Sequence, residues 1–212
     1  MFTTRSRLSA CLACVLAALS LTALAWTRPP EPDPLPKRWQ LDIDIGPLRV
    51  AQVDVPGAGP QVYYYLTYRV TNNSGQDLQF APVFELGTDE GELLRAGRDV
   101  PRAVRLELLS RLDNPFLEDQ IAILGNLLQG KENAKDGLVV WPVGDMDVDE
   151  VAVYAAGFSG ETARIELPDP KTGEKREIVL RKTFMVRYDI PGSLAMRGAE
   201  PLKPRDDRWI MR

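Results

Sequence analysis

The chain has 212 residues, a formal net charge of −4 and no histidine, and its two cysteines are Cys11 and Cys14. The lack of histidine excludes Ser-His-Asp and Cys-His catalysis as well as zinc sites built from imidazole. A mildly acidic chain has no electrostatic reason to bind nucleic acid or anionic lipid. We therefore expect neither a nucleic-acid partner nor an enzyme of these common classes.

The first 25 residues have the layout of a secretory signal peptide. Arg5 and Arg7 precede an apolar run over 8–24, and Ala23-Leu24-Ala25 forms an A-x-A cleavage signal. The sequence thus predicts export, to the periplasm or the extracellular space, with removal of 1–25. The apolar run is also long enough to remain as an N-terminal anchor over 8–25, and this is the one membrane contact we expect.

Three further regions follow the signal peptide. Prolines recur through 26–38, and because proline fixes φ and removes hydrogen-bond donors, this stretch is predicted to be an extended tether. Residues 39–190 have strand-like patterning throughout and are predicted to form a single domain. The tail, 191–212, ends in apolar residues that we expect to dock back on the domain.

The stretch from Gln61 to Leu86 is predicted to form a long β-hairpin. Apolar residues alternate with mixed ones along its first half, which is the two-residue period of a strand, and Asn72 to Gly75 are turn formers. A hairpin with one apolar face needs a covering layer, which favours a β-sandwich. Tyr63 and Tyr65 lie on the other face, where they form a sugar- or peptide-binding platform unless a second sheet or a helical insertion later in the chain covers them.

Shorter runs with the same period occur before and after this hairpin. Glycine and proline turns separate them, so the sequence predicts a mainly β, antiparallel sandwich. The additional strands are expected within 39–45, 48–55, 137–142, 151–155, 162–167 and 178–188.

The region 101–130 is predicted to be a helical insertion. Residues 102–112 fit either a strand or a helix, and we favour the helix. Asn114-Pro115 has the pattern of a helix N-cap, and Gly130 of a helix end. The apolar stripe of this second helix packs over an open part of the sandwich or docks a protein partner. Its candidate binding residues are Leu117, Ile121, Leu124 and Leu128.

The one dense carboxylate group consists of Asp145, Asp147, Asp149 and Glu150, and its three aspartates are the candidate metal ligands. Alternating acids can present oxygens to Ca²⁺, although the spacing does not match an EF-hand loop. The alternative is a solvated turn before the next strand. No spacing singles out two acids for glycoside hydrolysis, and no other cofactor is predicted.

Two stretches resemble exported bacterial immunoglobulin-like domains. Tyr65–Gly75 contains V-x-N-x-S-G before a turn, and Asp136–Pro142 contains G-x-[VL]-V-[FW]. The resemblance implies an immunoglobulin-like sandwich, from which the helical insertion departs, and it supplies no catalytic residues. We therefore expect a non-enzymatic interaction or structural module of the cell envelope with a possible protein partner. The alternative is a Ca²⁺- or carbohydrate-binding domain.

Overall fold

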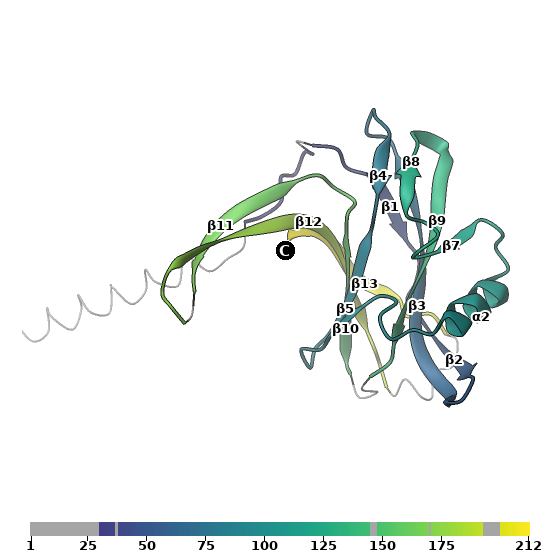
Figure 1. The fold of residues 1–212 in the computed structure, drawn as a ribbon. Helices are drawn as coiled ribbons and strands as arrows, with labels where there is room; N and C mark the ends of the chain where they lie inside the picture. Colours follow the sequence, from purple (N-terminus) through teal and green to yellow (C-terminus); the bar gives the residue numbers. More distant parts are fainter. Residues whose placement is uncertain (1–29, 37, 145–147, 170, 193–199) are drawn as a thin grey trace, which may run out of the picture. The chain divides into compact units, whose positions relative to one another are not determined.

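The computed structural model describes residues 30–36, 38–144, 148–169, 171–192 and 200–212. The chain divides into two compact units, and every described helix and strand lies in the second unit, Pro32–Arg212. This unit is mainly β, with a single helix, α2 (Arg102–Leu112), among the described residues (Figure 1). The strands are β1 (Asp42–Ile45), β2 (Arg49–Val55), β3 (Gly59–Asn72), β4 (Leu78–Phe80), β5 (Val83–Thr88), β6 (Leu93–Arg95), β7 (Leu117–Asp119), β8 (Gly125–Leu127), β9 (Gly130–Pro142), β10 (Glu150–Ala156), β11 (Thr162–Pro168), β12 (Lys175–Asp189) and β13 (Pro204–Met211).

The first sheet is built around β3. β2 and β1 pair with its successive halves along one edge, β9 pairs along the other edge, and β7 pairs with β9 in parallel. The predicted hairpin over Gln61–Leu86 is wrong, because β5 lies in the other sheet and β3 pairs with β9 instead. The buried Asn72 amide holds the chain after β3, since it donates to the carbonyls of Gln76 (2.8 Å) and Leu127 (2.9 Å).

The second sheet is built around β12. β10 and β13 flank its second half in antiparallel pairing, and β5 and then β6 follow beyond β10. β13 brings the chain's tail onto the domain, where Trp209 packs on Phe184 with ring centroids 5.1 Å apart. The prediction that the tail docks back is therefore confirmed.

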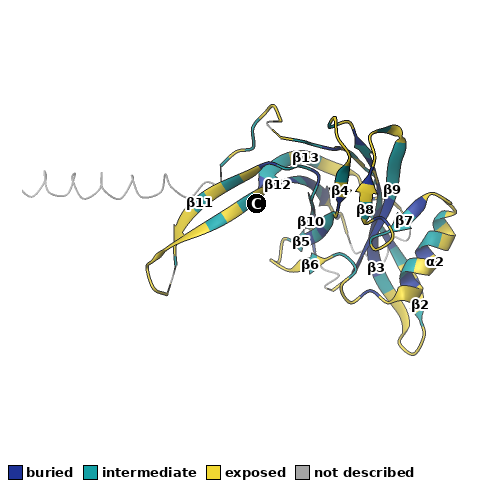
Figure 2. Ribbon diagram, turned by 45° about the horizontal axis from the view of Figure 1, so that its top comes forward, coloured by how far each residue is buried: buried dark blue, intermediate teal, exposed yellow. Residues whose placement is uncertain are grey.

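The main core lies between the two sheets (Figure 2). Its aromatic centre is formed by Phe158, whose ring meets those of Tyr68, Phe80 and Phe84 edge to face at 5.2–5.8 Å. Such tilted pairs add to the free energy gained from burial. Apolar side chains from both sheets complete this core, among them Leu66, Val139, Trp141, Val151, Val153, Val186 and Tyr188.

A second, smaller core lies on the outer face of the first sheet, beneath α2. Val104 and Leu108 are the buried residues of the helix, and they belong to one cluster with Tyr63, Tyr65 and residues of β9. The helix predicted over 102–112 is thus confirmed. Pro101 offers no side-chain cap at the first end of the helix, whereas Asp113 closes the other end in the left-handed conformation, with its N–H donating to the Leu109 carbonyl. Packing of Val104 and Leu108 is therefore the main support of the helix.

The second helix, predicted from Asn114 to Gly130, is wrong. The Asn114 side chain accepts a hydrogen bond from the Phe116 N–H (3.0 Å), and Asp119 Oδ1 accepts from Ile121 and Ala122 (2.9 Å each). These local turns compete with helix propagation. The region instead forms β7 and β8 joined by turns, and we call residues 116–128 the 116–128 loop.

Residues 162–181 form a two-stranded extension, which we call the arm. It consists of β11, a turn and the first half of β12, and β11 pairs with no other strand in the described chain. β10 and β13 pair only with the part of β12 from Lys182 onward, so the arm extends past both of them (Figure 1). Most arm residues are exposed or half-buried, as Figure 2 shows along β11.

Candidate interaction site

A groove of about 370 Å³ lies between the 116–128 loop and the segment around β5 and β6. Ile121 and Leu124 form part of its lining on the loop side, and both are exposed. Tyr68, Phe84 and Val139 are buried residues of the core that also line it. The groove therefore joins exposed apolar side chains to the edge of the main core, which is the kind of surface that binds an apolar partner.

Tyr68 is held in this position by a glycine. Gly137 is its cross-strand partner in β9, and a Cβ placed on Gly137 would lie 2.3 Å from the Tyr68 ring. The ring also packs against Phe84, with centroids 4.7 Å apart. The absence of a side chain at Gly137 thus lets the tyrosine ring lie across β9.

The Tyr68 hydroxyl is buried and has no hydrogen-bond partner among the described residues. Burial raises the pKa of this phenol, and the nearby Glu118 carboxylate raises it further, so the hydroxyl stays protonated. An unpaired buried hydroxyl costs free energy. The hydroxyl is enclosed, so Tyr68 lines the groove through its other atoms.

The predicted binding residues of this region divide between the surface and the interior. Ile121, Leu124 and Leu128 are exposed, whereas Leu117 is buried in the core beneath α2. Tyr63 and Tyr65 are also buried there, so they form no exposed platform. The prediction for these two tyrosines left open that the helical insertion covers them, and α2 does so.

The predicted carboxylate site lies mostly outside the described residues. Asp145 and Asp147 belong to the undescribed part, and Asp149 is exposed. The Asp149 N–H donates to Asp89 Oδ2 at 3.2 Å, and its carbonyl accepts from Ile190 at 2.8 Å. In the described part of the chain, no group of three or more His, Cys, Asp or Glu residues is placed to hold a metal ion.

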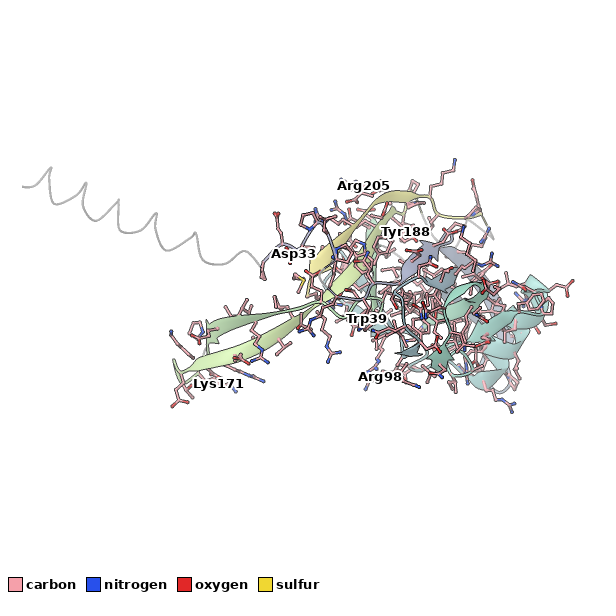
Figure 3. All side chains as sticks on the ribbon, turned by 90° about the horizontal axis from the view of Figure 1, so that it is seen from above. Asp33, Trp39, Arg98, Lys171, Tyr188 and Arg205 are labelled. Atoms are coloured by element: carbon pink, nitrogen blue, oxygen red, sulfur yellow. The ribbon has the colours of Figure 1, made fainter. Side chains whose placement is uncertain are left out.

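A buried ion pair at the base of the arm was not predicted from the sequence. Lys182 Nζ lies 2.9 Å from Glu161 Oε2 and 3.0 Å from the Asp33 carbonyl, and the Asp33 N–H donates to Glu161 Oε1 at 2.9 Å. Both charged side chains are almost fully buried. We call Lys182 and Glu161, together with the Asp33 backbone that bonds to both, the root ion pair. Figure 3 shows Asp33 at the base of the arm and Lys171 at its far end.

The root ion pair is expected to stabilise the fold less at acid pH than at neutral pH. Burial alone would raise the pKa of Glu161, but the Lys182 and Asp33 hydrogen bonds, with the Lys182 charge, outweigh it and lower the pKa. A lowered carboxyl pKa stabilises the fold fully above the ordinary value of about 4.3, and this contribution is lost as pH falls through the folded-state pKa.

We therefore expect the stability difference between wild type and Glu161→Gln to be largest at neutral pH and to shrink below about pH 4. Denaturant unfolding of both proteins across this range measures the difference. A difference that stays constant down to the acid end would contradict this assignment of Glu161.

Comparisons with protein-family models, with curated proteins and with solved structures give no match. Within the described ranges, no helix has the length and hydropathy needed to cross a bilayer. The functional argument therefore depends on the surfaces of this chain itself.

Proposed function

We propose that this chain is an exported, non-enzymatic interaction or structural module of the cell envelope, with an immunoglobulin-like β-sandwich as its domain. The signal-peptide pattern of 1–25 supports export to the periplasm or the extracellular space, and the same apolar run over 8–25 serves as an anchor if it is retained. Two sheets around a shared core support the sandwich. The parallel strand β7 and the layer formed by α2 are additions to it.

The observation that carries the interaction role is the groove beside the 116–128 loop. Large apolar side chains remain exposed at Ile121, Leu124 and Leu128, although the two cores nearby bury other residues of the same loop. Exposed apolar groups next to a lined groove are typical of protein-binding surfaces. A partner of this groove inserts an apolar side chain beside Ile121 and Leu124.

Replacing Leu124 by glutamate is expected to abolish capture of such a partner. The side chain is 48 % exposed, so the variant should fold, while the new charge would be desolvated inside the groove on binding. Chemical cross-linking and pull-down from envelope fractions, compared with the intact protein, measure the effect. Thermal melting of both proteins verifies that the fold is kept.

Leu106 provides a matched control on the solvent side of α2. It is 51 % exposed and does not line the groove, so Leu106→Glu should retain the partner. Equal capture by wild type and Leu124→Glu would refute the groove as the binding surface. Loss with both variants would point to a general effect of added charge and would refute it as well.

A further inference from the structure

The arm has one apolar face that continues the core-facing side of the second sheet. Lys182, Phe184 and Val186 lie on the core side of β12. Because alternate residues of a strand share a face, Leu180 and Ile178 lie on the same side of β12 within the arm. In the arm this side is formed by Ala163, Ile165 and Leu167 of β11 with Ile178 and Leu180 of β12. All five side chains are half-buried or exposed, because the first sheet does not reach this far.

Both edges of the arm are also open in the described chain. No strand pairs with the outer edge of β11, and β13 reaches along β12 only as far as the Arg181–Arg212 hydrogen bonds. A two-stranded ribbon with an apolar face is marginally stable alone in water, and additional strands stabilise it. Open edges are where such strands add.

The hydrogen bonds of the arm define which residues face the outer edge of β11. At its base, the Lys182 N–H donates to the Glu161 carbonyl at 3.0 Å. At its tip, the Asp169 N–H donates to the Glu174 carbonyl at 2.7 Å. Because bonding alternates along an antiparallel strand, the odd-numbered residues of β11 bond to β12. The even-numbered residues therefore direct their backbone groups outward.

We propose that the outer edge of β11 pairs in antiparallel register with β11 of a second copy of this chain, about a two-fold axis at Ile165. Arg164 and Glu166 are the outward-facing residues, and each then lies opposite the other in the second copy. Ile165 meets Ile165 of the second copy, and Ala163 meets Leu167, on the apolar face. A single interface thus joins opposite charges on one face and apolar side chains on the other.

Neighbouring registers are less favourable. An axis at Arg164 places this arginine opposite itself, and an axis at Glu166 does the same for the glutamate, so like charges meet. Antiparallel pairing of β11 with the outer edge of β12 in a second copy gives opposite charges only when Arg164 faces Glu177 and Glu166 faces Lys175, and that register places Ile165 opposite Arg176 on the apolar face. Of these registers, the Ile165 axis places opposite charges together on one face and apolar side chains together on the other. It joins the two ribbons into one four-stranded sheet with an apolar side.

A disulfide tests this register directly. Facing residues at a non-hydrogen-bonded position have Cα atoms about 4.5 Å apart, which suits a disulfide. The full chain in mild detergent, with Cys11→Ser and Cys14→Ser, should form covalent dimers on oxidation when it carries Ile165→Cys. The same chain with Leu167→Cys should not, because its position faces Ala163. Failure of Ile165→Cys to cross-link, or equal cross-linking by both, would overturn the proposal.

Charge reversal tests the same interface in solution. Arg164→Glu places two pairs of glutamates opposite one another and should weaken dimerisation by roughly tenfold or more. Lys171→Glu makes the same change of charge in the turn at the tip and should leave dimerisation unchanged. Sedimentation of wild type and both variants measures this. A monomeric wild type, or an unaffected Arg164→Glu dimer, would overturn the proposal, which does not depend on the groove at the 116–128 loop.

Discussion

Replacing Glu161 by leucine is expected to lower the free energy of unfolding by about 3 kcal/mol, because it leaves the Lys182 ammonium buried without its counter-ion. The Lys182 side chain is 3 % exposed, and its other close contacts are the Asp33 carbonyl and the face of Trp209, at 5.6 Å. The carbonyl and the ring are dipolar groups, so neither replaces the direct 2.9 Å contact with the Glu161 carboxylate. Urea unfolding of the two proteins at neutral pH measures the difference.

Two controls separate this effect from a general loss of charge. Glu107→Leu removes a carboxylate that also pairs with a basic side chain, Arg111 at 2.9 Å, but both side chains are about half exposed, so its cost should stay within about 1 kcal/mol. Adding Lys182→Met to Glu161→Leu removes the stranded charge and should restore most of the stability. Equal effects of the Glu161 and Glu107 substitutions would show that the root ion pair contributes no more than a surface pair.

Replacing Gly137 by alanine is expected to destabilise the domain by about 2 kcal/mol, within the range for overpacked cores. The new Cβ would overlap the ring of Tyr68, which packs against Phe84 and Phe158, so the ring must leave these contacts to relieve the clash. Alanine also has no β-strand advantage large enough to offset this clash. Thermal or denaturant unfolding measures the loss.

A double-mutant cycle identifies the clash as the cause. In a Tyr68→Leu background, the smaller side chain leaves room at position 137, so Gly137→Ala should cost clearly less than in wild type. If the alanine costs the same in both backgrounds, the destabilisation does not arise from the tyrosine ring.

The individual strands were predictable, but their partners were not. The two-residue period in β3 and β12 is a local property of the sequence, because each strand has an apolar face toward the main core. The pairing of β3 with β9 depends on residues distant in the chain, such as Tyr65 opposite Val140. The turn formers that begin at Asn72 indicated a hairpin. In the structure the buried Asn72 side chain instead bonds to the carbonyls of Gln76 and Leu127, and the chain goes on to the second sheet.

Of the candidate site, the sequence predicted residues but not the surface that they form. The apolar pattern indicated Ile121 and Leu124, but as part of a helix, because Asn114 and Asp119 have the same side-chain chemistry in a turn as in a cap. Tyr68 at the groove follows from tertiary packing alone. The sequence did contain one indication of the root ion pair, because Lys182 is the charged residue among the alternating apolar residues of β12. Nothing near it in the sequence identified Glu161 as its partner.

The outer edge of β12 within the arm determines how far association can proceed. Its outward-facing residues are Lys175, Glu177, Val179 and Arg181, because the even-numbered residues of β12 bond to β11. Charged side chains at three of these four positions are a common way in which natural sheets limit edge-to-edge pairing. The proposed two-fold pairing uses the β11 edge of both copies and so closes on itself, and the free edges that it leaves on the four-stranded sheet are these charged ones.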